Sequence, residues 1–198
     1  MNISKRLRTV LLVLALAIIA FVFLDFHLAK SATANNTSTS RVNSQVPEGY
    51  QAGGTTLYIV PAQNDPLTRT LAQTVFQRAK SSAYLSPILL DAIPQGDQYP
   101  IVLVAVTDSQ FFWTPFYARS TLKTEFAFSN FEVLTAIEIP KGTTLPSDGT
   151  QPAIAGDGQG EQTDQSFGLI SLPGYRSLVC DLAAKSIVGD LEKMVQVK

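Results

Sequence analysis

The sequence predicts an α+β fold, in which a mixed or mostly antiparallel sheet of four to five strands carries two helices on one face, behind an N-terminal transmembrane helix. Three observations lead to this fold class. An uncharged apolar run comes first in the chain. Two later segments place apolar residues at helical spacing. Between them, several segments are β-branched or alternate apolar with polar residues.

The apolar run extends from Thr9 to Phe26 and follows the basic residues Lys5, Arg6 and Arg8. Basic residues on that side favour a cytoplasmic N-terminus. A helix of this length measures about 27 Å, which is enough for the hydrocarbon core of a bilayer. Residues 1–30 are therefore predicted to form a single-pass anchor that makes the membrane a partner. The alternative is a signal peptide cleaved after the Ala-x-Ala site at 32–34, which would give a secreted protein.

Residues 31–54 are rich in Ser, Thr, Asn and Gly and show almost no apolar periodicity. Such a segment buries too little surface to offset its conformational entropy, so the sequence predicts a flexible linker. Residues 55–198 are then predicted to form one extracytoplasmic domain.

The first elements of this domain are a strand over Thr55 to Val60 and a helix that begins after an Asp65 N-cap, with Pro66 in its first turn. An edge strand is predicted over Ile88 to Ile93. The run from Ile101 to Val106 is apolar at every position and predicts the central strand.

Two alternating strands are predicted next, over Phe116 to Phe128 and Glu132 to Ile139. Residues 140–165 combine glycines, prolines and acidic residues, which predicts a mobile loop. A strand over Ser166 to Leu172 and a helix over Ser177 to Val195 complete the domain.

The residue inventory excludes several kinds of chemistry. His27 is the only histidine, so the predicted domain has no base for a Ser/His/Asp or Cys/His site. The glycines at 156–160 are not followed by the Gly-Lys-Ser/Thr of a phosphate-binding loop. The lone Cys180 is interpreted as a small buried hydrophobe. No catalytic residue, metal ligand or cofactor site is predicted.

Residues 47–198 carry ten Lys/Arg and fifteen Asp/Glu, a net charge of −5, which argues against nucleic acid as a partner.

The acidic residues suggest two further interpretations. Four acidic residues in the predicted loop could bind Ca²⁺: Asp148, Asp157, Glu161 and Asp164. Their spacing does not match that of an EF-hand, so a solvated acidic loop is the favoured interpretation. A carboxylate-dependent hydrolase would use acids near predicted strand ends: Asp91, Asp97 or Asp108.

One segment departs from an ordinary domain, because five aromatic residues crowd a bend around Pro115. They are Phe111, Phe112, Trp113, Phe116 and Tyr117. Two interpretations remain open. The aromatics plug the end of the sheet, or they form an exposed lip that contacts a partner protein or a lipid.

The order strand, helix, several strands, helix behind an export segment, over Thr55 to Val195, is similar to that of the LptE-type lipopolysaccharide-assembly lipoproteins. The lipid-modified cysteine that those proteins carry behind the signal peptide is missing here, so no functional residue is carried over. The sequence therefore predicts a non-enzymatic, membrane-anchored binding or assembly module. The alternatives are the carboxylate-dependent hydrolase and a structural subunit of a membrane complex.

Overall fold

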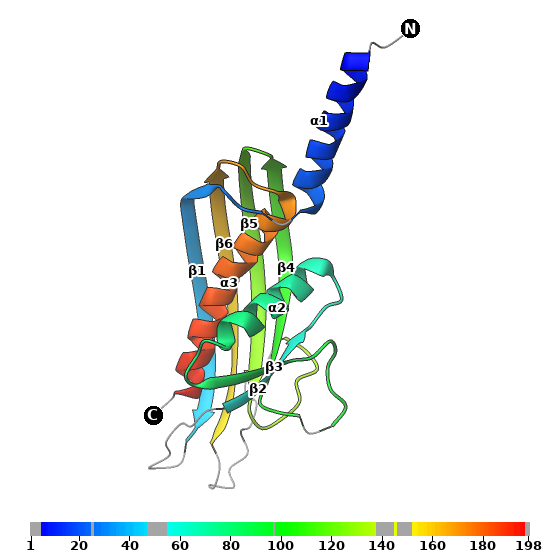
Figure 1. Cartoon of the computed structure of the whole chain (residues 1–198). Helices are drawn as coiled ribbons and strands as arrows, with labels where there is room; N and C mark the ends of the chain where they lie inside the picture. The colour runs from blue at the N-terminus through cyan, green and yellow to red at the C-terminus, as the bar shows by residue number, and fades with distance from the viewer. Residues whose placement is uncertain are drawn as a thin grey trace.

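The computed structural model describes residues 5–24, 26–46, 55–96, 98–137, 145 and 152–196. Within these residues the fold is α+β, with one six-stranded mixed sheet and three helices (Figure 1). The strand order is β1-β6-β5-β4-β2-β3, and β2 runs parallel to both of its neighbours while all other pairs are antiparallel. The sheet thus has more strands than the four to five predicted.

The four long strands form the antiparallel part of the sheet. They are β1 (Lys30–Gln45), β6 (Ala153–Phe167), β5 (Tyr117–Ser129) and β4 (Ile101–Thr114). The two short strands, β2 (Thr55–Pro61) and β3 (Leu85–Leu89), continue the sheet beyond β4. The central strand predicted over Ile101 to Val106 is confirmed, and its residues 101–105 are buried.

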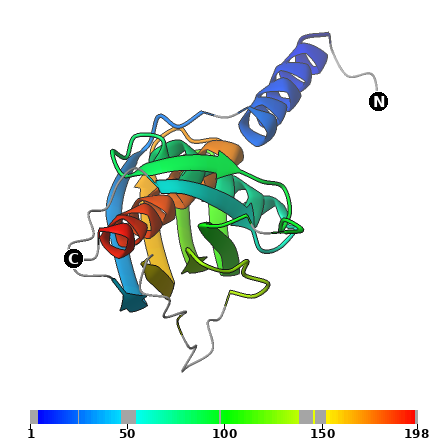
Figure 2. The same cartoon turned by 90° about the horizontal axis from the view of Figure 1, so that it is seen from below.

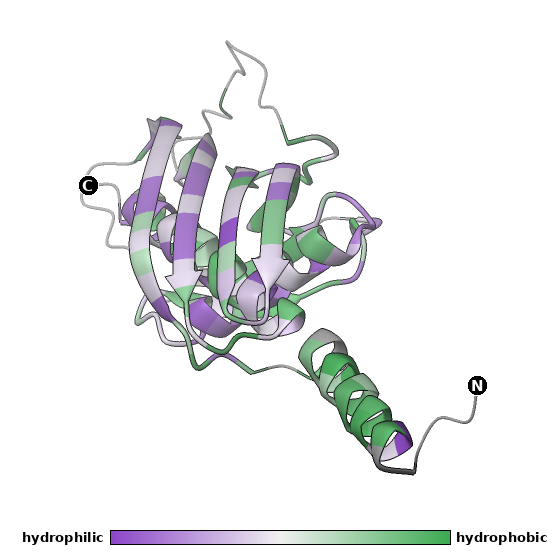
Figure 3. Cartoon of the chain, turned by 90° about the horizontal axis from the view of Figure 1, so that it is seen from above, coloured by the Kyte–Doolittle hydropathy of each residue, from purple (hydrophilic) through white to green (hydrophobic). Residues whose placement is uncertain are grey.

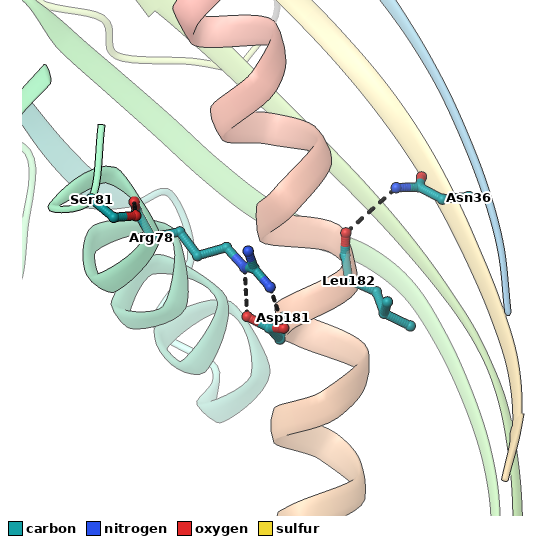
Figure 4. Close-up of polar contacts among 5 residues, drawn as sticks. All are labelled: Asn36, Arg78, Ser81, Asp181 and Leu182. Carbon is teal, nitrogen blue, oxygen red and sulfur yellow. Dashed lines mark hydrogen bonds and ion pairs between the residues drawn. The ribbon is translucent and has the colours of Figure 1, made fainter. Parts of the chain in front are cut away.

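Helices α2 (Pro66–Ala79) and α3 (Leu172–Val195) cover the same face of the sheet, as Figures 1 and 2 show from two directions. The main core lies between this inner face and the two helices. A half-exposed ion pair between Arg78 and Asp181 joins α2 to α3, and the side chain of Asn36 donates to the carbonyl oxygen of Leu182 (Figure 4). A smaller core lies where residues 131–137 cover the sheet near β2.

Helix α1 (Lys5–Phe23) differs from the membrane anchor predicted over Thr9 to Phe26. It contains the three basic residues and ends before Phe26, so its uncharged part, Thr9 to Phe23, measures only about 22 Å against a hydrocarbon core of about 30 Å. In the described part of the chain, no helix has the length and apolar character needed to cross a bilayer. The predictions of a transmembrane anchor and of a single-pass topology were therefore wrong.

The predicted linker is also wrong over most of its length, because Lys30–Gln45 is strand β1. Residues 47–54 lie outside the described chain. The predicted mobile loop is strand β6 from Ala153 onward, whereas most of 140–151 is not described. The strand predicted over Glu132 to Ile139 is absent from residues 132–137, the part that the structure describes.

Helix α3 begins five residues earlier than predicted. Ser171 is its N-cap, and its hydroxyl accepts a hydrogen bond from the backbone N–H of Gly174 at 3.1 Å. Pro173 lies in the first turn, where its missing N–H is tolerated. Gly174 is required there because a Cβ atom would collide with the carbonyl oxygen of Phe26. Pro173 and Gly174, which fell between the predicted strand and the predicted helix, thus belong to the first turn of α3.

The Asp65 N-cap is confirmed, since its Oδ1 accepts from the backbone N–H groups of Leu67 at 3.0 Å and Thr68 at 2.9 Å. Burial opposes ionisation of Asp65, but these hydrogen bonds outweigh it and hold the pKa of the carboxyl below its ordinary value.

Replacing Asp65 with alanine should lower the free energy of unfolding by about 1 kcal/mol at neutral pH. Because the folded-state pKa is the lower one, this contribution is fully present above the unfolded pKa of about 4, declines below it, and is lost as the pH falls through the folded-state pKa. Urea denaturation of both proteins at pH 7 and pH 3 measures this. A difference that is as large at pH 3 as at pH 7 would contradict the capping account.

Candidate functional site

The sheet face opposite the helices, here called the outer face, is largely uncovered along the four long strands. On β5 the side chains of Ala118, Ser120 and Leu122 are buried toward the helices. The alternation of a strand therefore directs Arg119 and Thr121 to the outer face. In Figure 3 the long strands carry hydrophilic bands.

A groove of about 630 Å³ lies on this face. Two rows of directly paired residues cross it from β1 to β4. The first row is Thr33, Gln165, Arg119 and Phe112. The second is Asn35, Thr163, Thr121 and Gln110. We call these eight residues the outer-face groove.

Three aromatic side chains border the groove at the end where the β4–β5 hairpin turns. The ring centroid of Tyr117 lies 4.9 Å from that of Phe167 and 6.0 Å from that of Phe112. The Arg119 guanidinium lies 5.5 Å from the Phe112 centroid, within range of a cation–π contact. We call Phe112, Tyr117, Phe167 and Arg119 the aromatic rim.

The predicted aromatic segment divides between the two faces of the sheet. Phe111 and Trp113 pack against the main core, and the Trp113 Nε1–H donates to the carbonyl oxygen of Ile170 at 3.1 Å. Phe112 and Phe116 are 49% and 66% exposed. Phe111 and Trp113 thus plug the end of the sheet, whereas Phe112 and Phe116 are exposed, and their contact with a partner protein or a lipid stays a prediction.

Charge is unevenly distributed along the outer face. Among the residues that the structure describes near the rim, the exposed charges are the cations Arg119 and Lys30, and Lys30 pairs with Phe167. Asp164 reaches the groove from the inner face, but its carboxylate accepts hydrogen bonds from the hydroxyls of Ser31 and Ser166. Farther along, Glu161 and Asp108 lie beside Lys123. The rim end is therefore cationic and aromatic, and the middle of the face is mixed in charge.

The floor of the groove is held by Tyr175, which is fully buried on α3. Its ring meets Phe111 edge to face at 6.1 Å, and its hydroxyl lies 3.0 Å from Ser120 Oγ and 3.1 Å from the carbonyl oxygen of Asp164. Burial raises the pKa of Tyr175, so it stays a neutral donor. The α3 helix thereby fixes β5 and β6, the two strands that carry Arg119 and Gln165.

The acidic residues considered as Ca²⁺ ligands do not lie close together. Asp157 lies on the outer face in an ion pair with Arg41 at 2.7 Å, and Asp164 is buried on the inner face. Asp148 lies outside the described residues. Among the residues that are described, no group of three or more His, Cys, Asp or Glu is placed to hold a metal.

The acids considered for hydrolysis are also separate. Asp91 lines a cavity of about 360 Å³ beside α2, together with Arg69. Asp108 lies on β4 and pairs with Lys123 at 3.7 Å. Asp97 is not described. The described lining of the cavity that contains Asp91 does not include Asp108.

The glycines at 156–160 lie within β6, with Gly156, Gly158 and Gly160 facing the core. A Cβ atom at Gly156 would lie 2.8 Å from Met194 Sδ, so this glycine allows close packing under α3, and a Cβ atom at Gly158 would overlap the Phe126 ring. Cys180 is buried as expected, and burial raises the pKa of its thiol to about 12, which keeps it protonated.

Several groove residues were missed by sequence reasoning. Thr33 and Asn35 fell in the supposed linker, and Thr163 and Gln165 in the supposed mobile loop. Arg119 lay within the alternating strand predicted over Phe116 to Phe128 but was not singled out. Its alternation with buried Ala118 and Ser120 was the signal that could have identified it.

No protein-family model and no curated protein matches the chain. Among solved structures it is similar to the PelC dodecamer from Paraburkholderia phytofirmans, with a TM-score of 0.39 and 8% identity over 81% of this chain and 99% of that one. A point variant of the same protein gives a TM-score of 0.36 and 10% identity over 80% and 99%. Similarity at this level assigns neither a fold nor a function to the chain.

Proposed function

We propose that the chain is a non-enzymatic binding or assembly module that contacts a partner protein through the outer-face groove and the aromatic rim. The observation that carries this proposal is the exposure of Phe112 and Phe167, at 49% and 56%, beside Arg119. Aromatic residues and arginine are enriched at interface positions that contribute most to affinity, whereas Lys, Glu and Asp are depleted there.

The shape of the site supports a protein over a lipid. The groove is open and is lined mostly by hydroxyl and amide side chains, such as Thr121, Thr163 and Gln165. Such a lining can donate and accept hydrogen bonds to a polypeptide backbone, but it gives no dry channel for an acyl chain. The rim supplies apolar contact, and Arg119 can pair with a carboxylate or a carbonyl of the partner.

Nothing in the groove favours the hydrolase alternative. A nucleophile needs a base within hydrogen-bonding reach. Apart from Asp164, the groove is lined by Thr, Asn, Gln, Phe and Arg side chains and by Ser120, whose hydroxyl accepts a hydrogen bond from Tyr175. Asp164 also lines the groove, but its carboxylate is engaged by two serine hydroxyls.

Changing Arg119 to alanine or Phe112 to serine should reduce capture of the partner by tenfold or more, as loss of about 1.4 kcal/mol or more of binding free energy implies. Both side chains are exposed, so the free energy of unfolding should change by less than about 1 kcal/mol. The tagged full chain would be purified from cells that naturally produce it, and co-purified proteins quantified.

Arg69→Ala is the matched control, because Arg69 is an exposed arginine on α2. It should leave capture unchanged. A parallel flotation assay with vesicles of phosphatidylcholine and phosphatidylglycerol tests the lipid alternative. Binding to vesicles that Arg119→Ala abolishes, without any protein capture sensitive to that variant, would refute the proposal.

A further inference from the structure

Strand β1 is an unprotected edge of the sheet. It is 16 residues long, all of them exposed, and β6 is its only neighbour in the described sheet. From Thr33 to Ser40 it contains no charge, no proline and no irregularity in its pairing. Natural proteins usually blunt an edge of this length with lysine, proline, a bulge or a covering segment, because its free backbone groups recruit another strand.

The opposite edge of the same sheet shows such protection. Strand β3 has only five residues, and Pro87 in its middle lacks a backbone N–H. The two edges therefore differ in length and in pairing capacity, which makes β1 the edge that is open to extension.

The structure shows which backbone groups of β1 face outward. A Cβ atom built on Gly156 or Gly158 would lie 2.8 or 3.1 Å from the carbonyl oxygen of Arg41 or Thr39, so these carbonyls point toward β6. Since the direction alternates along a strand, the N–H and C=O of Ser38 and Ser40 point to the free edge. The backbone N–H and C=O groups of Ser38 and Ser40 are exposed, so they can form hydrogen bonds with an added strand.

We infer that β1 pairs antiparallel with β1 of a second copy of this chain, about a two-fold axis perpendicular to the sheet. The charge pattern of β1 supports self-pairing. In a register centred on Thr37 or Ser38, Arg41 lies opposite Thr33 or Asn35 of the second copy, so like charges never face each other. Threonine and serine pairs across such a ladder are favourable.

This symmetry places the outer faces of the two copies on the same side of the extended sheet, because directly opposite residues of two paired strands point to the same side. The six-stranded sheets become one continuous sheet, and the two outer-face grooves lie on the same side of it. Arg41 of the second copy then stands next to the β1 wall of the groove, formed by Thr33 and Asn35. The dimer thereby presents two binding faces together.

Ser38→Pro is the sharpest test variant. It removes an N–H that points to the free edge and breaks no bond to β6, so the fold is expected to persist. Sedimentation equilibrium of the full chain over a concentration series should show a dimer for the wild type and for the control Ser38→Ala. Dimerisation of Ser38→Pro should be at least tenfold weaker. A monomeric wild type, or a Ser38→Pro protein that associates like the wild type, overturns the inference.

Disulfide trapping tests the same contact without proline. Cys180 is buried, so a cysteine placed at Thr37 or Ser38 is the accessible thiol of the described chain. At the two-fold axis the two Cα atoms come within the 7 Å or so that a disulfide needs. Thr37→Cys or Ser38→Cys should give a reducible dimer under mild oxidation, and Ser86→Cys on β3 should not. Equal trapping at all three positions would mean random collision and would refute the pairing.

Discussion

Replacing Tyr175 with alanine should lower the free energy of unfolding by about 3–5 kcal/mol, the range found when a large buried aromatic side chain is removed. Tyr175 is fully buried, packs edge to face on Phe111, and bonds through its hydroxyl to Ser120 and Asp164. It is the residue that joins α3 to the floor of the groove. A typical domain has only about 5–15 kcal/mol to lose.

Tyr175→Phe separates packing from hydrogen bonding. It keeps the ring and should cost about 1–2 kcal/mol, because the buried carbonyl oxygen of Asp164 and the hydroxyl of Ser120 lose a partner. Urea denaturation followed by circular dichroism measures both variants. If Tyr175→Ala cost no more than Tyr175→Phe, the ring would not be a central packing element and the account of the groove floor would be wrong.

Gly158→Ala should be destabilising by about 1–3 kcal/mol, although alanine ordinarily suits a strand better than glycine does. A Cβ atom at this position would overlap the Phe126 ring, with Cζ only 2.7 Å away, and that ring is buried in the main core. The ring would have to leave its place, or β6 would have to move away from β5.

Gly189→Ala is the matched control, and the expected sign is opposite. Gly189 lies inside α3 and has nothing within 4 Å of an added Cβ atom. Alanine there should stabilise the protein by about 0.5–1 kcal/mol, because glycine is unfavourable within a helix. Thermal denaturation of the two variants should move the midpoint in opposite directions. A shift of the same sign in both would contradict the close packing inferred at Gly158.

The sequence predicted those elements whose two faces differ in polarity or whose ends carry capping residues. The helix after Asp65 and the alternation in Tyr117–Ser129 are examples. Strand β1 could not be found in this way, because both of its faces are exposed and it is held by backbone bonds to β6, which leave no pattern in the side chains. Strand β6 was not recognised because glycines recur in it: α3 packs closely over Gly156, and the Phe126 ring packs over Gly158.

The candidate site was only partly predictable for the same reason. The aromatic segment was recognised, but which rings are exposed depends on the register of β4 against β5, where Phe112 pairs with Arg119. The hydroxyl and amide residues of the groove come from β1 and β6, the two strands that the sequence concealed. A groove formed by four strands exists only after long-range pairing, so local patterns could not reveal it.

Site-specific photocrosslinking tests the central claim, that the outer face near the rim contacts a partner protein, most directly. A photoreactive amino acid would replace Phe112 in one full-length protein and Lys185, an exposed position on α3, in another. Irradiation in cells that naturally produce the chain should give a discrete cross-linked protein from position 112 that the Arg119→Ala change removes. Position 185 should give none. Products that are equal at both positions, or a product from position 185 alone, would contradict the account.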